Sequence, residues 1–126
     1  MTRPVNRPLA VAAAIAVAAF GAFAAPAPAS AHWSCGRAAP SDRDTSGNHI
    51  VYYNSVPSRV GSSRRCAIQE NYIFQSDRLD YHCYTRDIDN TEFWTYVVVV
   101  GQNKRGWIRE SDLADGGSNV RCVGDT

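Results

Sequence analysis

A run of apolar residues followed by a polar turn between two glycines most constrains how this chain folds. Residues 93–100 read Phe-Trp-Thr-Tyr-Val-Val-Val-Val, and both alternating faces of this run are apolar, which is typical of a strand inside a sheet. Gly101 and Gly106 enclose the polar turn that follows, where a tight hairpin requires backbone with positive φ. A second short strand is expected at residues 107–109. The sequence therefore predicts a central β-hairpin.

The first 31 residues have the composition of a cleaved export signal. Arg3 and Arg7 form a positive segment, an alanine-rich apolar run follows over residues 9–25, and a small-residue cleavage site ends at Ala31. We expect cleavage between Ala31 and His32. The alternative is a membrane anchor, but the run is short for a span and alanine is only weakly apolar. We therefore expect a secreted, extracellular protein without stable membrane insertion after cleavage.

The mature part is large enough for one domain and is nearly neutral. Cleavage leaves 95 of the 126 residues, and it removes two of the 13 lysines and arginines. The remaining 11 basic and 12 acidic residues give a net charge near −1. This balance argues against nucleic acid as a partner, because nucleic-acid binding depends on neutralising phosphates.

The cysteine content predicts disulfide bonds. All four cysteines (Cys35, Cys66, Cys83 and Cys122) lie in the mature part. An even number of cysteines in a small exported domain is typical of disulfides, so we expect two bridges, and the sequence alone allows three pairings. Spacings of 31, 17 and 39 residues contain no Cys-x-x-Cys pair, which argues against a zinc site. We expect neither a metal nor a cofactor.

Two irregular segments flank the expected strands. Residues 32–48 show neither a helical nor a strand period, so we expect an N-terminal arm held by Cys35. Residues 115–126 are expected to form a loose C-terminal tail that is pinned only by Cys122.

Short strand-like runs occupy the segment between the arm and the tail. Apolar runs lie at residues 50–53 and 72–74, and residues 78–84 alternate as a half-buried strand does. The segment 54–58 is expected to end the first run, and residues 111–113 are expected to form a helical turn that closes the domain. Five or six short strands without a long amphipathic helix predict an all-β fold, a small barrel or sandwich.

The hairpin also carries a family resemblance. It contains Trp94-x-x-Val97, a turn at Gly101, Gly106-Trp107-Ile108 and a closing Leu113. This order resembles the end of a bacterial SH3-like (SH3b) domain. Residues 52–58, Tyr-Tyr-Asn-Ser-Val-Pro-Ser, are similar in length and in their Pro-Ser to the opening strand of that family. The resemblance covers about residues 50–113 and implies an SH3-like barrel of five to six short strands over residues 49–114.

The resemblance implies a binding module and no catalytic residues, and we expect the module to be a monomer. Modules of this family are often directed at cell-wall peptides, so the expected partner is a cell-wall peptide or glycan, or an extracellular protein. The resemblance also implies a bridge between Cys83 and Cys122, because exported relatives often carry one cysteine in the strand before the tryptophan and another in the tail. With it we prefer the bridge between Cys35 and Cys66.

A barrel of this kind predicts both a core and a groove. Inward residues come from each strand, and those expected here are Val51 or Tyr53, Phe74, Leu79, Tyr81, Val97, Val99 and Ile108. SH3-like domains tend to line a shallow groove with aromatic rings, which implies Tyr53, Tyr84, Trp94 and Trp107 as ligand-binding candidates. For the two tryptophans the alternative is packing in the core.

Two other classes of function are compatible with the sequence. His82 lies two residues from Asp80 on the polar side of a strand, so the pair could support acid–base catalysis in a small secreted hydrolase or ribonuclease. The loop Ser58–Arg65 could be presented to a protease by a secreted inhibitor. Neither a serine-nucleophile motif nor a zinc-protease motif is present in the sequence.

Overall fold

The computed structural model describes residues 31–125, and the predicted export signal lies outside them apart from Ala31. The described part contains five strands and one 3-10 turn. They are β1 (Ser55–Val56), β2 (Ile73–Phe74), β3 (Leu79–Arg86), β4 (Phe93–Val99), β5 (Arg105–Arg109) and η1 (Glu110–Asp112). No helix in this part is long and apolar enough to cross a bilayer. The all-β prediction is confirmed, and η1 matches the helical turn expected at residues 111–113.

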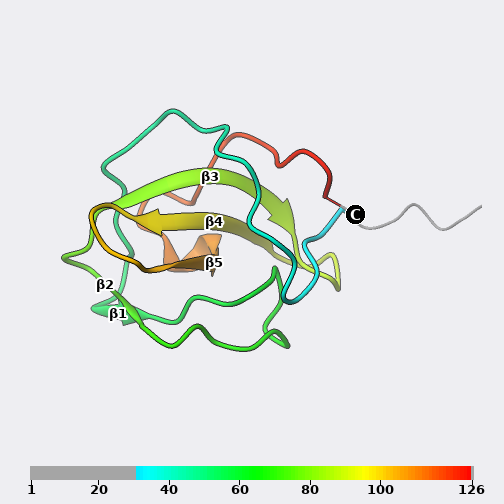
Figure 1. Cartoon of the computed structure of the whole chain (residues 1–126), viewed down its shortest axis with the longest axis horizontal. Coiled ribbons are helices and arrows are strands. Elements are labelled where there is room, and N and C mark those ends of the chain that lie inside the picture. Colours follow the sequence, from blue (N-terminus) through cyan, green and yellow to red (C-terminus); the bar gives the residue numbers. More distant parts are fainter. Residues whose placement is uncertain (1–30, 126) are drawn as a thin grey trace, which may run out of the picture.

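β4 and β5 form the hairpin that the sequence predicts. The two strands pair antiparallel (Figure 1), the turn between them has positive φ at Gly101 (76°), and Gly106 (152°) is the second residue of β5. Gly106 also approaches the neighbouring segment closely, because a Cβ at this position would lie 2.8 Å from the Ser58 side chain. Gly101 is therefore required by the turn, and Gly106 is required by its positive φ and by the close packing of Ser58 on β5.

β3 pairs with the other edge of β4 and contains a β-bulge. Tyr81 pairs with Val97 and Cys83 pairs with Tyr96, so His82 is an extra residue in β3. A bulge shifts the side-chain alternation of a strand by one residue. Buried side chains before His82 therefore point to one face of the sheet, and those after it point to the other face.

The three-stranded sheet is consequently buried on both faces. One face packs in a hydrophobic cluster of Val51, Val56, Ile73, Leu79, Tyr81, Val97, Val99, Ile108 and Leu113. The other face packs in a second cluster of Trp33, Cys83, Trp94, Tyr96, Trp107 and Cys122. β4 contributes alternate residues to both clusters, which explains why its sequence is apolar on both faces.

Two of the expected core residues lie at the surface. Phe74 and Tyr53 are 50 and 53 % exposed, whereas Ile73 and Val51 are fully buried. The pairing of β1 with β2 places Ile73 opposite Val56, and alternation then turns Phe74 outward. The expectation for Phe74 is therefore wrong by one residue, and Val51 rather than Tyr53 is the inward residue of its segment. The other expected core residues are buried: Leu79, Tyr81, Val97, Val99 and Ile108.

The strand expected at residues 50–53 is not formed. Val51 makes a single antiparallel bridge with Leu113, and β1 forms later, within the segment expected to end the strand. The backbone N–H of Tyr52 donates to the Asp112 carbonyl at 2.8 Å. This segment therefore pairs with the residues that close the domain. A short apolar run in the sequence does not show which distant segment it will pair with.

The N-terminal arm covers the second face of the sheet, and Figure 1 shows it crossing the strands. Trp33 is 4 % exposed and packs on Trp107 with ring centroids 5.7 Å apart. The backbone N–H of Trp33 donates to the Ser62 hydroxyl at 2.8 Å, and Cys35 is bonded to Cys66. The arm is thus held by a buried ring and a buried hydrogen bond as well as by its disulfide.

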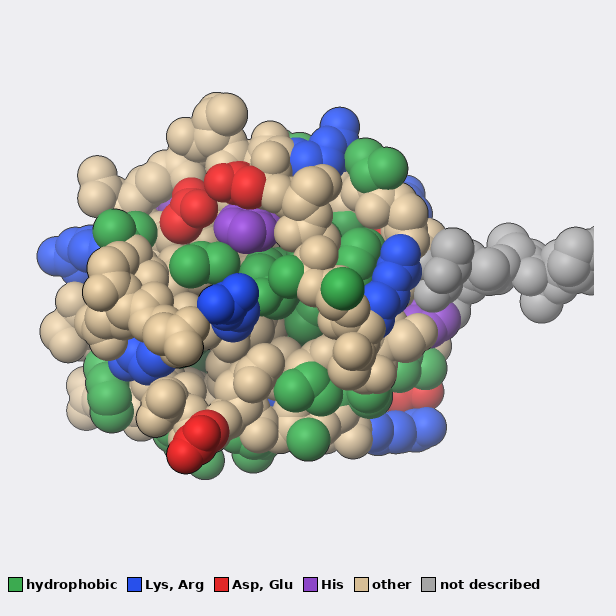
Figure 2. Space-filling view, viewed as in Figure 1, with side chains coloured by type: hydrophobic (Ala, Val, Ile, Leu, Met, Phe, Trp, Pro, Cys, Tyr) green, Lys and Arg blue, Asp and Glu red, His purple; other side chains and the backbone are tan. Residues whose placement is uncertain are grey.

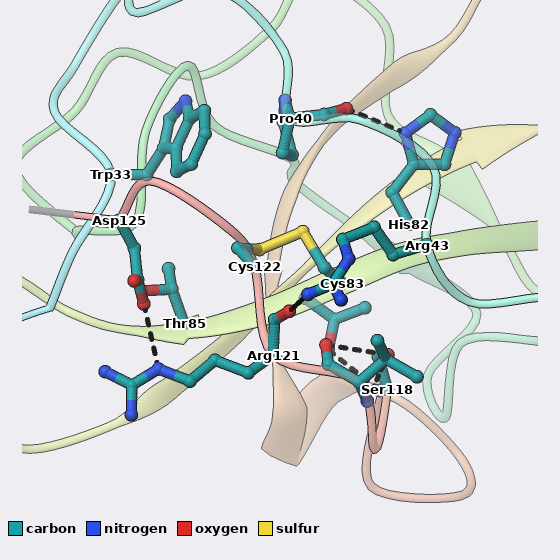
Figure 3. Close-up of a disulfide and its surroundings, with 12 residues drawn as sticks. Trp33, Pro40, Arg43, His82, Cys83, Thr85, Ser118, Arg121, Cys122 and Asp125 are labelled. Carbon is teal, nitrogen blue, oxygen red and sulfur yellow. Dashed lines mark hydrogen bonds and ion pairs between the residues drawn. A yellow bond between two sulfur atoms is a disulfide. The ribbon is translucent and has the colours of Figure 1, made fainter.

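The C-terminal tail lies along β3 and is held by more than Cys122 (Figure 3). Cys122 is bonded to Cys83, so both bridges have the preferred pairing. Tyr84 exchanges two backbone hydrogen bonds with the tail, at 2.8 and 2.9 Å. The Arg43 guanidinium of the arm donates to the Arg121 carbonyl at 2.7 Å. The expectation of a loose tail is therefore wrong, because the tail adds a parallel edge to β3.

Candidate ligand-binding surface

The four aromatic residues expected to line a groove fall into two groups. Trp94 and Trp107 are each 1 % exposed and belong to the second hydrophobic cluster. Their burial fits the alternative of core packing, because the arm and the tail cover the face of the sheet that carries them. Trp107 still lines a surface pocket of about 270 Å³ between the arm and β5. Tyr53 is half exposed and Tyr84 is partly exposed, so these two rings are accessible.

Tyr53 belongs to an exposed aromatic surface on and beside the β1–β2 pair. Tyr52, Tyr53, Tyr72 and Phe74 are 62, 53, 45 and 50 % exposed, and we call these four residues the ribbon surface. The rings of Tyr52 and Tyr53 meet edge to face with centroids 5.0 Å apart. Three of the four residues were not expected to contact a ligand. Phe74 lies in a strand of two residues, and Tyr52 and Tyr72 lie outside the strands, so no side-chain period in the sequence predicts which of them face outward.

A nearly buried ion pair supports the ribbon surface. Lys104 Nζ lies 2.5 Å from Asp77 Oδ2, and the two side chains are 10 and 6 % exposed. The same Nζ lies 4.7 Å from the centroid of the Phe74 ring and donates to the Tyr72 carbonyl at 3.1 Å. Burial opposes ionisation of Asp77, but hydrogen bonds from Lys104 and from the Phe74 N–H lower its pKa. The ammonium group therefore fixes two of the four aromatic residues.

Tyr84 lines a different site, a surface pocket of about 240 Å³. Phe93 and Glu110 also line this pocket, and the Phe93 ring meets the Tyr84 ring edge to face with centroids 5.8 Å apart. Burial raises the pKa of Glu110 to about 7. Tyr53 is not among the lining residues, so Tyr53 and Tyr84 do not share one pocket.

His82 approaches two carboxylates, as an acid–base pair requires. Its Nε2 lies 3.6 Å from Asp80 Oδ2 and 4.0 Å from Asp42 Oδ2. Its Nδ1–H donates to the Pro40 carbonyl at 3.2 Å, because a carbonyl can only accept. Desolvation and then the charge of Asp42 raise the pKa of Asp80. Within residues 31–125 this is the group that could hold a metal ion, and no arginine or lysine there pairs with it.

A second histidine lies in a network with the order of a hydrolase triad. His49 Nδ1 lies 2.5 Å from Asp115 Oδ2, and its Nε2 lies 2.9 Å from Ser46 Oγ. The Ser46 hydroxyl also lies 2.5 Å from Asp44 Oδ1. Burial opposes ionisation of Asp44, but hydrogen bonds from Ser118 and Ser46 lower its pKa. An ionised carboxylate is the stronger acceptor, so the Ser46 proton points to Asp44 and the imidazole does not activate the hydroxyl.

This network joins the arm, β3 and the tail. The His49 ring stacks on the Tyr81 ring at a centroid distance of 3.7 Å, and the Tyr81 hydroxyl donates to Asp115 Oδ1 at 2.6 Å. Burial raises the pKa of Tyr81. Burial also opposes ionisation of Asp115, but hydrogen bonds from Tyr81 and His49 lower its pKa. We assign the network to stability, and its members lie too far apart in sequence for a motif to reveal them.

The loop Ser58–Arg65 is packed rather than presented. Ser58 and Ser62 have no exposed surface, and a Cβ at Gly61 would lie 2.7 Å from Cys66 Sγ. A protease inhibitor needs a loop that protrudes from the domain, and most of this loop does not. The arrangement therefore gives no support to the inhibitor alternative.

Comparison with protein-family models, curated proteins and solved structures gives no match to this chain. On the face seen in Figure 2, acidic and basic side chains are interspersed in small groups, in keeping with the near-neutral charge of residues 32–126.

Proposed function

We propose that the chain is an exported, monomeric binding module and that the ribbon surface is its ligand-binding face. The observation that carries this proposal is the exposure of Tyr52, Tyr53, Tyr72 and Phe74 around one strand pair. Clusters of exposed apolar rings mark interaction sites more often than isolated exposed residues do. Tyrosine rings offer a large, rigid contact area and a hydroxyl that can form a hydrogen bond at the rim.

We propose that the domain is an SH3-like barrel, because of the path that residues 49–59 take between the strands. His49 bridges Leu79, in the strand at one edge of the three-stranded sheet, and Arg59 bridges Trp107, in the strand at the other edge. The segment therefore runs from one outer strand to the other, as the closing segment of a barrel does. The resemblance of the hairpin to SH3b domains supports the same architecture.

Export is proposed from the composition of residues 1–31 and from the two disulfides. Disulfides form and persist in oxidising compartments. The mass of the protein recovered from the medium of an exporting bacterial host tests this proposal. A chain that begins at His32 is expected, and retention of the full chain in the membrane would contradict it.

The proposed ligand is a polymer of the cell envelope, peptide or glycan. Sugar rings and peptide planes can lie flat on exposed aromatic rings, and such contacts need little charge. The cation that packs on the Phe74 ring of this surface, Lys104, is already paired with Asp77. The surface therefore offers apolar contact and tyrosine hydroxyls rather than net charge, which fits a polymer better than a strongly charged partner.

Retention on insoluble cell-wall material tests the ribbon surface. The oxidised protein is expected to sediment with cell wall, and the double variant Tyr52→Ser/Tyr53→Ser is expected to stay in solution. Val123→Ser is the matched control, because Val123 is 62 % exposed and lies outside the surface. Equal retention of the double variant would reject this face, and no retention of the native protein on any wall material would reject the polymer.

The proposed module is non-catalytic, and one observation favours a second candidate. His82 with Asp80 and Asp42 is the arrangement in the described residues that most resembles an acid–base site. Cleavage of RNA or of a glycan by the purified protein, lost in His82→Gln, would replace the binding role with a hydrolase. Activity that persists in that variant would indicate a contaminant.

A further inference from the structure

The pocket beside Tyr84 is separate from the ribbon surface and has its own chemistry. It lies between β3, β4, η1 and the tail and is lined by Tyr84, Phe93, Glu110, Gly116, Ser118 and Asn119. Its volume of about 240 Å³ is that of a side-chain-sized group rather than of a drug-sized ligand.

Glu110 is a carboxyl group in this pocket that has no partner among the residues that the structure describes. Its side chain forms no hydrogen bond or ion pair with residues 31–125, and burial is the cause of its raised pKa. The neighbouring cations are already engaged, since Arg109 pairs with Asp112 and Glu92, and Arg86 donates to Asn90. The described chain therefore supplies no positive charge to this carboxyl group.

Gly117 holds the Glu110 side chain in place. A Cβ at Gly117 would lie 2.8 Å from Glu110 Cγ, so the backbone of the tail packs directly on this side chain. Gly117 has a φ of 94°, a conformation that favours glycine. The adjacent Gly116 has open space where a side chain would be. The tail thus restrains the carboxyl group and leaves the pocket open.

The aromatic wall of the pocket suits a cation. Phe93 is 39 % exposed, and the Arg86 guanidinium carbon already lies 4.8 Å from its ring centroid. The face of an aromatic ring attracts cations through its quadrupole. Asn119 is exposed beside the rings and forms no side-chain hydrogen bond with the described residues, so its amide oxygen is available as a second acceptor.

We propose that the pocket of Tyr84, Phe93 and Glu110 binds the ammonium group of a primary amine. The carboxylate and the amide oxygen accept hydrogen bonds from the ammonium, and the rings cover its alkyl arm. Both a free alkylamine and a lysine-type side chain present this group. The inference does not depend on the ribbon surface, which shares no residue with the pocket.

Binding through this pocket should depend on pH because it needs the ionised form of Glu110. The charged or titratable groups around Glu110 are Tyr81 and Tyr84 of β3 and, in its own segment, Arg109 and Asp112. Burial is the cause of the raised pKa of Glu110, about 7. The ionised fraction therefore rises about tenfold between pH 6 and pH 8, and affinity for an ammonium should rise with it.

NMR titration of the oxidised protein with N-acetyl-lysine N-methylamide tests the proposal. We expect saturable shifts at Tyr84, Phe93 and Asn119, with an affinity about tenfold higher at pH 8 than at pH 6. n-Butylammonium distinguishes a free amine from a lysine-type arm. The norleucine analogue, which lacks the ammonium, is the ligand control, and equal binding of that analogue would overturn the proposal.

Two variants separate the carboxylate from the surrounding charge. Glu110→Gln keeps the shape of the side chain and should weaken binding at pH 8 at least tenfold and abolish its pH dependence. Glu70→Gln, at an exposed position outside the pocket, should bind as the native protein does. Unchanged affinity in Glu110→Gln, or no binding of either amine at pH 8, would overturn the proposal, and neither result bears on retention by cell wall.

Discussion

The Trp33 ring lies against the Trp107 ring, with centroids 5.7 Å apart and planes inclined by 39°. This contact joins an arm without regular secondary structure to the last strand of the sheet. Arg37 of the same arm places its guanidinium carbon 3.7 Å from the centroid of the Trp33 ring. The second hydrophobic cluster thus depends on a segment whose sequence shows no period.

Replacing Trp33 with alanine should therefore destabilise the whole domain. Trp33 is 4 % exposed, and removing a buried tryptophan side chain costs about 3–5 kcal/mol of unfolding free energy. Guanidinium denaturation measures the change. Val123→Ala, at a position that is 62 % exposed, should change the same quantity by less than about 0.5 kcal/mol. A loss below about 1 kcal/mol for Trp33→Ala would show that the arm is not part of the core.

Trp94 differs from Trp33 in one polar atom. Trp33 Nε1 donates to the Ala38 carbonyl at 2.9 Å, whereas Trp94 Nε1 is buried and has no hydrogen-bond partner among residues 31–125. An unsatisfied buried N–H lowers the free energy of unfolding by about 1–3 kcal/mol. Trp94→Phe removes this N–H and so offsets part of the stability that is lost with the packing of the larger ring. Trp94→Phe should therefore destabilise the protein less than Trp33→Phe does, although Trp94 is the more deeply buried ring. The reverse order in matched denaturation curves would contradict this.

The features that the sequence predicts correctly are those with local signals. The apolar run of β4 and the two glycines of the turn identify the hairpin, and the alternation at residues 78–84 identifies β3. Each signal lies within a few consecutive residues, and the backbone conformation that it demands is set by those residues alone.

The features that were missed depend on distant contacts. The bulge at His82 is not visible in the sequence. Buried and partly exposed residues alternate along β3 without a break, although the buried side chains before and after His82 point to opposite faces of the sheet. Trp94 and Trp107 are covered by segments from both ends of the described chain. β2 has only two residues and therefore shows no side-chain period. Which of Ile73 and Phe74 points into the core is set by the pairing of β2 with β1.

The two disulfides should contribute unequally to stability. They close loops of 39 and 31 residues, for which chain entropy alone predicts about 4 kcal/mol each. Cys83 and Cys122 both lie in the second hydrophobic cluster, whereas Cys35 is exposed. Serine at Cys83 and Cys122 buries two hydroxyl groups, whereas serine at Cys35 and Cys66 buries one, at Cys66, which is 2 % exposed. The pair Cys83→Ser/Cys122→Ser should therefore lower the melting temperature more than Cys35→Ser/Cys66→Ser, and equal losses would show that loop closure dominates.

Glu110→Gln should make the protein more stable at alkaline pH. The folded-state pKa of Glu110, about 7, lies above its ordinary value of 4.5. The folded state therefore binds the proton more tightly, and stability falls as pH rises from about 4.5 to about 7. After allowance for solvent screening, the variant should gain about 1 kcal/mol at pH 8 and nothing below pH 5. The same gain at both pH values would contradict the pKa assignment.

Asp77→Asn should remove the ion pair that holds Lys104 against Phe74 of the ribbon surface. It should also weaken the dependence of the unfolding free energy on pH at acid pH. Asp77 and Lys104 are 6 and 10 % exposed, and removing one partner of a buried pair costs about 3–5 kcal/mol. Burial opposes ionisation of Asp77, but hydrogen bonds from Lys104 and the Phe74 N–H depress its folded-state pKa. Its contribution is therefore present above its ordinary pKa of 3.8 and is lost as pH falls through the depressed value.

The loss in Asp77→Asn should thus be largest at pH 7 and should shrink as the pH is lowered below 4, when the native carboxyl group also becomes neutral. Urea denaturation at a series of pH values measures both curves. Glu70→Gln, at an exposed position, is the control that changes charge without breaking a buried pair. If the difference between native protein and Asp77→Asn stays constant down to pH 2, Asp77 acts through shape rather than charge, and Lys104 does not brace Phe74 through an ion pair.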